Sequence, residues 1–215
     1  MTSFHTSFIL GFHGCDEDTA VDLLNGKPFR QSSEDFDWLG SGAYFWEGDP
    51  GRALEWAIEK QNRGSYKKAA VVGAVIDLGN CLDLTVRENL DLLSDAYRSF
   101  ETARVKAGLA LPVNKDVKGS KEGDKLLRYL DCAVIRHLHE NIEDEVRKAR
   151  DSGTSPLIQP FDTVRGLFVE GENVYPGGGF YQKTHTQIAV RSETRIIGVF
   201  RPRNLQSAEE PIGPS

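Results

Sequence analysis

Three short stretches, far apart in the chain, carry side chains of types that could bind a flat, polar ligand. GFHG (residues 11–14) places a histidine beside a glycine, and LGSGAYFW (residues 39–46) places small residues before an aromatic run. HTQIAV (residues 185–190) begins with a histidine and a glutamine. An aromatic face attracts a flat cationic ring by about 0.5–2 kcal/mol, and glycine lets a ligand approach the backbone. LGSGAYFW therefore has two interpretations, a glycine-loosened core strand or the wall of a ligand site.

In this order and at these distances, the three stretches resemble the three sequence blocks of the ADP-ribosyltransferase superfamily. The closest resemblance is to its diphtheria-toxin and poly(ADP-ribose) polymerase branch, whose signature is His, Tyr and Glu. It covers roughly the first third and the last quarter of the chain. The resemblance implies an α+β fold with a split antiparallel sheet as its core, and NAD as the substrate.

The first two blocks then imply specific roles. His13 would bind the adenosine ribose, and Gly14 would hold the nicotinamide amide through its backbone. Tyr44, in the Gly42-Ala43-Tyr44 match to the Gly-x-Tyr of the family, would stack on the nicotinamide, with Trp56 on the next helix as the second wall.

The same residues also have purely structural interpretations. His13 could be a histidine at the end of a strand with its hydrogen bonds satisfied, and Trp56 an ordinary core aromatic of a helix. Tyr44 could be a core aromatic too, although successive strand residues face opposite sides, so that Phe45 or Trp46 would fill the core instead.

The third block departs from the family pattern, because Gln187 stands where the polymerase-like branch has glutamate. A carboxylate orients the ribose and offsets the positive charge that develops as nicotinamide leaves. A charge pair at 4 Å is worth about 4 kcal/mol at an effective dielectric constant of 20, so its loss would slow the reaction up to thousands-fold. Either another acid replaces it, or catalysis is slow, or the protein only binds. His185, two residues earlier, is a further candidate for the NAD site.

The nearest candidate acids are Glu170 and Glu172, whose spacing resembles the Glu-x-Glu of the arginine-specific transferases. That pair normally enters the last-block strand directly, so the alternative is a solvated turn. Glu170 is nevertheless retained as a candidate catalytic residue. Arg165 could approach the pyrophosphate or simply form a surface ion pair, and the glycine-rich loop 173–184 would take the acceptor-recognition position.

Composition limits the partners. The chain has 215 residues and a net charge of -6, which disfavours a general polyanion-binding surface. A local basic cluster is either a solvated face or a nucleic-acid contact; it comprises Lys106, Lys115, Lys118, Lys121, Lys125 and Arg128. His137 and His139 have no matching ligands, so we expect surface residues and no metal site.

Three widely spaced cysteines and an N-terminus without a basic, apolar leader favour a cytoplasmic protein without a membrane contact.

Hydrophobic periodicity indicates where the elements that position these residues lie. Strands are predicted at 6–13, 69–79, 163–171, 187–192 and 195–203, and helices at 16–26, 49–61, 85–108 and 124–150. Strands and helices are segregated, which indicates an α+β fold in a single domain spanning 1–215. A helical insertion at about 85–155 and a flexible tail at about 206–215 complete the prediction.

The resulting hypothesis is an NAD-dependent mono-ADP-ribosyltransferase that modifies a protein or nucleic acid, with a toxin or defence role and an antitoxin as expectations by analogy. Polymer elongation is not expected without the glutamate. The alternatives are an NAD- or ADP-ribose-binding pseudoenzyme or interaction module, and an NAD glycohydrolase.

Overall fold

The computed structural model describes residues 8–118, 122–203 and 205, so the predicted flexible tail at 206–215 and Lys121 lie outside the described residues. The strands are β1 (Phe8–Asp16), β2 (Ala43–Glu47), β3 (Ala69–Asp77), β4 (Cys81–Asp83), β5 (Thr163–Phe168), β6 (His185–Val190) and β7 (Ile196–Phe200). The helices are α1 (Glu17–Leu24), α2 (Pro50–Asn62), α3 (Arg87–Lys106), α4 (Tyr129–Asp151) and the short 3-10 turn η1 (Glu193–Arg195).

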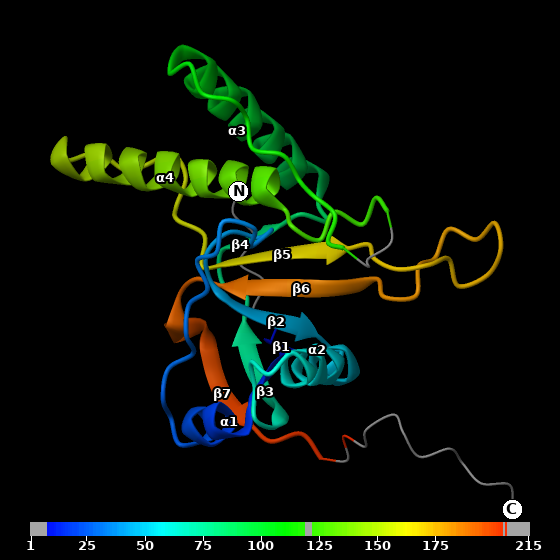
Figure 1. Cartoon of the computed structure of the whole chain (residues 1–215). Coiled ribbons are helices and arrows are strands. Elements are labelled where there is room, and N and C mark those ends of the chain that lie inside the picture. Colours follow the sequence, from blue (N-terminus) through cyan, green and yellow to red (C-terminus); the bar gives the residue numbers. More distant parts are fainter. Residues whose placement is uncertain (1–7, 119–121, 204, 206–215) are drawn as a thin grey trace, which may run out of the picture.

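All seven strands form one sheet, in the order β4-β5-β6-β2-β1-β3-β7. Every neighbouring pair is antiparallel except β4 and β5, which run parallel. Figure 1 shows this sheet with helices packed on it. The loop between β5 and β6 projects beyond the ends of these two strands (Figure 1). The α+β class is therefore confirmed, with a mostly antiparallel sheet.

Pairing between β1 and β2 is sparse, although the two strands are neighbours. They are in register only at Gly11 with Glu47 and at Phe12 with Trp46, whereas β1 and β3 pair along their whole length. Beyond Phe12 the two strands separate. His13 therefore lies at the point where the sheet opens.

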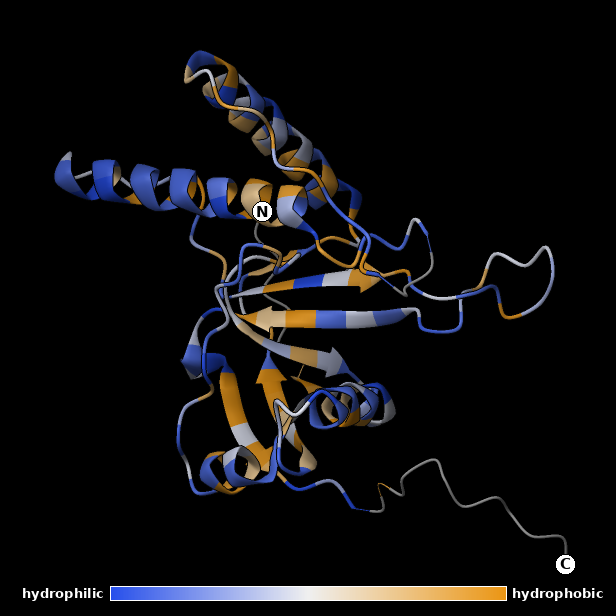
Figure 2. Ribbon diagram, in the orientation of Figure 1, coloured by the Kyte–Doolittle hydropathy of each residue, from blue (hydrophilic) through white to orange (hydrophobic). Residues whose placement is uncertain are grey.

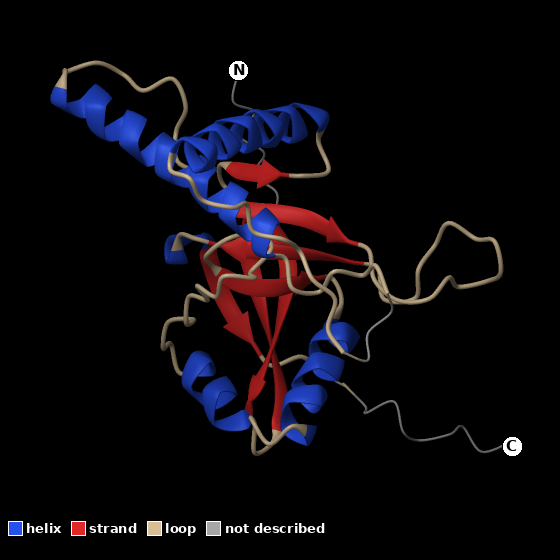
Figure 3. Cartoon of the chain, turned by 45° about the horizontal axis from the view of Figure 1, so that its top comes forward, coloured by secondary structure: helices blue, strands red, loops and turns tan. Residues whose placement is uncertain are grey.

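The two faces of the sheet carry different helices, and we call them the α1 face and the α2 face. On the α1 face, Phe45, Val72 and Ile188 pack with Ala20 and Leu23 of α1. Figure 3 shows α1 and α2 on opposite sides of the same strands. Because side chains alternate along a strand, each functional residue can be assigned to one face from the register.

The α2 face is covered by two separate groups of helices. Over β1 and β3, Phe12, Trp46 and Val71 pack with Ala53 of α2. Over β4, β5 and β6, Val164 and Ala189 pack with side chains of α3 and α4. A strip of sheet therefore lies between α2 and the α3–α4 block.

The α3–α4 block lies where the helical insertion is predicted, and its two long helices match the two helices predicted there. Both are amphipathic, and Figure 2 shows the outer part of α4 as largely hydrophilic. His139, expected on the surface, is buried on α4 against Phe161 at a ring-centroid distance of 6.1 Å. That expectation is wrong because His139 shares the core-facing side of α4 with Ile135 and Ile142.

Candidate functional site

The strip between α2 and the α3–α4 block gathers most of the residues that the sequence singled out. Tyr44 is in register with Ala189, and Trp46 with Gln187. All four side chains therefore lie on the α2 face, since directly opposed residues share a face. His185, two residues from Gln187 on β6, lies there too.

Tyr44 is fixed in the core beneath the α3–α4 block. Its hydroxyl donates to the Gly40 carbonyl oxygen at 2.7 Å and accepts from the Leu39 backbone N–H at 3.0 Å. Burial raises the pKa of this hydroxyl well above its ordinary value, so it stays a donor. The ring packs with the apolar cluster of Leu39 and Val134. In this structure Tyr44 stabilises the turn that precedes β2.

Two tryptophans form an aromatic group further along the same face. Trp56 of α2 lies 5.8 Å from Trp46 between ring centroids, and Trp46 lies 6.2 Å from the His185 ring. His185 in turn stacks on Phe168 at 5.5 Å with an interplanar angle of 14°. Trp46 is buried as predicted for a core residue, whereas Trp56 remains partly exposed. Trp56 thus presents an aromatic surface at the edge of this group.

A buried ion pair borders the same aromatic residues. Arg52 Nη2 contacts both carboxylate oxygens of Glu170, at 3.3 and 3.1 Å, and the two side chains are only 11% and 9% exposed. Glu170 is therefore not in a solvated turn, whereas Glu172 is exposed. Arg52 stands in the first turn of α2, where a positive charge opposes the helix dipole. That unfavourable position for a cation is the sequence signal that could have identified Arg52, which the sequence analysis missed.

Several polar atoms in this group have no hydrogen-bond partner among the described residues. They are Arg52 Nε and Nη1, Trp46 Nε1 and His185 Nε2. Arg52 Nη1 has an ionic neighbour in Glu55 at 3.7 Å, beyond hydrogen-bond distance. Buried polar atoms without partners are costly, so such a concentration indicates a place for a polar ligand. We call Trp46, Arg52, Trp56, Phe168, Glu170 and His185 the Arg52 cluster.

The protonation state of His185 follows from its contacts. Its Nδ1 lies 2.6 Å from the Lys183 carbonyl oxygen, which can only accept, so Nδ1 carries the proton. Burial, with a smaller contribution from Arg52, lowers the pKa of His185 below its ordinary value, while the Lys183 carbonyl opposes this. The ring is therefore neutral at pH 7, and Nε2 offers a buried lone pair to a hydroxyl donor.

Gln187 is oriented by a tryptophan from the loop before β2. Trp38 Nε1 donates to Gln187 Oε1 at 2.6 Å, and because an indole N–H can only donate, the amide NH₂ must point the other way. The backbone N–H of Lys183 donates to the Glu170 carbonyl at 3.1 Å, which pairs those two residues. Gln187 is in register with Gly166 of β5, four residues before Glu170. Glu170 therefore lies beyond the end of β5, whereas Gln187 lies within the paired part of β6.

His13 lies on the opposite, α1 face. Its ring contacts Phe29 at 5.4 Å and Phe45 at 5.7 Å between centroids. Nδ1 donates to the Tyr44 carbonyl oxygen at 2.8 Å, which bridges the gap where β1 and β2 separate. Burial lowers the pKa of His13, so it is neutral at pH 7 with Nε2 as an acceptor. The structure thus does not bring the His13 ring to the face that carries Gln187 and the Arg52 cluster.

Gly14 and Gly42 have packing reasons for lacking a side chain. A Cβ on Gly14 would overlap the Ala53 carbonyl oxygen of α2, and one on Gly42 would lie 3.0 Å from the Ala189 Cβ. Gly14 therefore allows α2 to lie close to β1.

Arg165 forms ion pairs on the α1 face, not on the face of the Arg52 cluster. Its Nε lies 2.6 Å from Glu47 Oε2, and its Nη1 lies 3.0 Å from Asp83 Oδ2. This is the ion-pair interpretation of Arg165, and β4 supplies one of its partners. Parts of the predicted basic cluster are neutralised in the same way, since Lys125 pairs with Asp116 and Arg128 with Asp131.

The loop between β5 and β6 leaves the sheet next to the Arg52 cluster. It continues as a short hairpin in which Val174 N–H donates to the Phe180 carbonyl oxygen at 2.9 Å. Its outer side chains Val174, Tyr175 and Phe180 are exposed. In Figure 1 the loop that carries this exposed apolar tip projects beyond the ends of β5 and β6.

Among the described residues, no group of three or more His, Cys, Asp or Glu side chains could hold a metal ion. Within the same residues, none of the helices has the length and apolar character needed to cross a membrane.

Comparisons with known proteins give no indication of the chemistry of this chain. No family model matches the chain, and no solved structure matches it. The chain is 28% identical over 99 residues to an uncharacterized protein of Methanocaldococcus jannaschii, MJ0359. The match covers 44% of this chain and 46% of that protein, so the chain spans less than half the length of this relative.

Proposed function

We propose that this protein binds NAD at the Arg52 cluster and transfers its ADP-ribose to a macromolecular acceptor, as a mono-ADP-ribosyltransferase. The observation that carries the proposal is the combination of groups in that cluster. Trp56 offers a partly exposed aromatic ring, packed against the buried Trp46, to a nicotinamide. Arg52 offers N–H donors that have no hydrogen-bond partner among the described residues to a pyrophosphate. Glu170 adds a carboxylate beside them.

Glu170 is the residue that we propose supplies the negative charge absent from Gln187. A carboxylate that contacts a buried guanidinium through both oxygens is held in a fixed direction. Near a ribose it would offset the positive charge that develops as the glycosidic bond to nicotinamide breaks. Neutral His185 would accept a hydrogen bond from a ribose hydroxyl through Nε2.

Gln187 has a positioning role in this proposal. Its amide oxygen already accepts a hydrogen bond from the Trp38 indole, and it is in register with Gly166, four residues before Glu170. His13 likewise holds β2 through the Tyr44 carbonyl and would reach a ligand only through the opening between β1 and β2. The exposed hairpin 173–184 is the proposed contact for the acceptor, and a cytoplasmic toxin role controlled by an antitoxin remains part of the hypothesis.

The test is transfer from NAD labelled in its adenylate phosphate to proteins and nucleic acids of a cell lysate. We expect the wild type to label an acceptor, Glu170→Gln to lose at least a hundredfold in rate, and Glu172→Gln to match the wild type. Because Glu170→Gln leaves Arg52 buried without its partner, melting curves and Glu170→Asp accompany it. Equal rates for folded Glu170→Gln and wild type would contradict the role of Glu170.

A second function, nucleotide binding without transfer, is favoured by one observation. The Gln187 amide oxygen is engaged by Trp38, and no carboxylate takes its place within the same stretch of β6. In that case NAD binds saturably but neither labelled acceptor nor free nicotinamide is formed. Release of nicotinamide without any labelled acceptor would instead identify an NAD glycohydrolase.

A further inference from the structure

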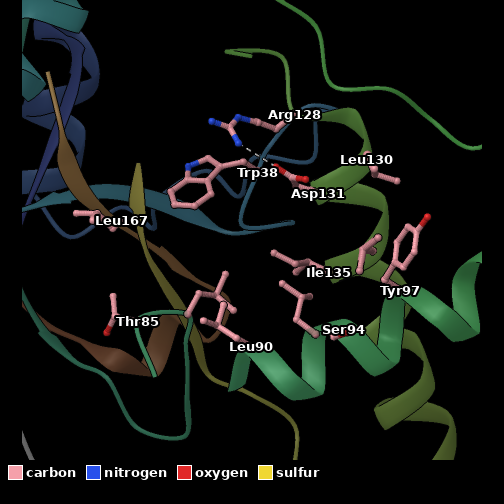
Figure 4. Close-up of a pocket in the computed structure, with 13 residues that line it drawn as sticks. Trp38, Thr85, Leu90, Ser94, Tyr97, Arg128, Leu130, Asp131, Ile135 and Leu167 are labelled. Carbon is pink, nitrogen blue, oxygen red and sulfur yellow. Dashed lines mark hydrogen bonds and ion pairs between the residues drawn. The ribbon is translucent and has the colours of Figure 1, made fainter. Parts of the chain in front are cut away.

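A cavity opens between the α3–α4 block and the β4–β5 edge of the sheet, beside the Arg52 cluster. Its volume is about 740 Å³. Figure 4 shows residues of α3 and α4 on one side, with Trp38, Thr85 and Leu167 across from them. Cavities of this size, bounded by separate elements, are typical of small-molecule sites.

The lining of this cavity is mostly apolar. Leu90 and Leu167 remain 48% and 52% exposed at its rim, next to the Trp38 ring. Exposed leucines on both sides of one cavity leave apolar surface in water, which a bound apolar molecule would cover. The partly exposed Trp38 ring adds a flat surface on which a ring can lie.

A few polar groups interrupt this apolar surface. Arg128 lines the cavity and is held by Asp131 at 3.3 Å and by the Asp124 carbonyl oxygen at 3.0 Å. Its guanidinium also lies 4.6 Å from the Phe168 ring centroid, and its Nε has no hydrogen-bond partner among the described residues. The remaining N–H of Arg128 can therefore donate to an acceptor group on a ligand.

We propose that this cavity binds a small, flat, apolar molecule that carries one hydrogen-bond acceptor, such as an aromatic carboxylate. Its apolar body lies among Trp38, Leu90 and Leu167, and its acceptor group faces Arg128. A molecule in this position touches the same Trp38 whose N–H holds Gln187. The cavity is thus a second ligand site. It meets the Arg52 cluster at Phe168, whose ring lies 5.1 Å from the Trp38 ring and 4.6 Å from the Arg128 guanidinium, and it does not depend on NAD binding.

The indole N–H signals in a proton–nitrogen NMR spectrum test this site, because the chain has three tryptophans. We use 2-naphthoate as the probe. Saturable binding should shift the Trp38 signal, assigned with Trp38→Phe, while the Trp46 and Trp56 signals move less. Absence of saturable binding, or larger shifts at Trp46 and Trp56 than at Trp38, would overturn the proposal.

A cavity-filling variant with a matched control gives the second readout. Ser94→Phe places a ring in the cavity from α3, whereas Thr102→Phe adds the same ring at an exposed position on α3 outside it. We expect Ser94→Phe to weaken 2-naphthoate binding at least tenfold and Thr102→Phe to leave it unchanged. Equal affinity of both variants, or a wild-type dimer that Ser94→Phe dissociates, would show that the cavity is not this ligand's site.

Discussion

At the level of single residues, Tyr44 illustrates how one side chain can satisfy two interpretations of a motif. Its ring lies on the α2 face, as a ligand wall would, but its hydroxyl is used by the backbone of Leu39 and Gly40. The motif LGSGAYFW therefore folds into a turn that is closed by its own tyrosine. Gly40 permits that turn with a φ of 76°, a conformation that glycine adopts readily.

Removing this hydroxyl should lower stability without changing nucleotide affinity. Tyr44→Phe loses two hydrogen bonds and leaves a buried N–H unpaired, which costs about 1–3 kcal/mol. For a chain of this length the melting temperature falls by roughly 2–4 °C per kcal/mol. Differential scanning calorimetry of Tyr44→Phe measures this, with exposed Tyr175→Phe as the control. A melting temperature equal to that of the wild type would contradict the assigned role.

His139 should make the protein sensitive to acid. Both ring nitrogens are buried without a partner, and burial, aided by Arg191, lowers the pKa of His139 from 6.5 to about 3. Between those two pH values the unfolded state binds more protons than the folded state, so the free energy of unfolding falls as the pH falls. His13 and His185, whose pKa values are also lowered, act in the same direction.

Replacing His139 should remove part of this pH dependence. Between pH 7.5 and 5.0, His139→Leu is expected to lose about 2 kcal/mol less unfolding free energy than the wild type. Urea denaturation at the two pH values measures the difference. His137→Leu, at a half-buried position two residues away, is the control. An identical pH dependence for His139→Leu and the wild type would show that His139 does not titrate in this way.

At the level of elements, α2 is the helix that positions the Arg52 cluster. Asp49 caps it by accepting the Arg52 backbone N–H at 2.9 Å, and Pro50 begins it. Its approach to the sheet depends on Gly14, above which the Ala53 carbonyl lies. The distance between Trp56 of α2 and Trp46 of β2 therefore depends on Gly14 of β1.

Gly14→Ala should displace α2. The new methyl group meets backbone, which cannot rotate away, so we expect a loss of about 1–3 kcal/mol and a changed near-ultraviolet circular dichroism of Trp46 and Trp56. Gly51→Ala, in the first turn of α2, meets only the Asp49 side chain at 3.5 Å and should be neutral or slightly stabilising. A melting temperature and a near-ultraviolet circular dichroism spectrum of Gly14→Ala equal to those of the wild type would contradict this role of Gly14 in positioning α2.

Long helices and strands with a clear hydrophobic period could be predicted from the sequence. Short strands that depend on pairing with a distant part of the chain could not. The β-branched run of β3 and the Asp49-Pro50 start of α2 were each placed to within two residues. β4 was missed because it has only three residues and exists through parallel pairing with β5, far along the chain. The helix predicted to begin at residue 85 begins at Arg87 instead, because the Thr85 side chain bonds to Asp83.

The candidate site was predictable only in part, for a similar reason. Sequence pointed to Trp56, Glu170 and His185 one at a time, and these three are in the Arg52 cluster. The burial of Glu170 depends on Arg52, more than a hundred residues away, which no local pattern reveals. The face of His13 depends on where β1 and β2 separate, which is a property of the whole sheet.

At the level of the whole molecule, two helical groups share one face of a single sheet and leave a strip between them. The Arg52 cluster lies on that strip at the side of α2, and the cavity lies at the side of α3 and α4. Trp38 connects the two, because its ring lies 5.1 Å from the Phe168 ring between centroids. A net charge of -6 requires that an anionic ligand be held by local cations, and Arg52 is the buried cation at the cluster.

The dissociation constant of NAD, measured by titration calorimetry for wild type and Trp56→Ala, tests the central claim most directly. The wild type should bind NAD at one saturable site. Trp56→Ala removes the partly exposed aromatic ring and should weaken binding about two- to thirtyfold, the equivalent of about 0.5–2 kcal/mol. Tyr175→Ala, which removes an exposed aromatic far from α2 in the chain, should bind like the wild type. No saturable binding by the wild type, or equal affinity in Trp56→Ala, would contradict an NAD site at the Arg52 cluster.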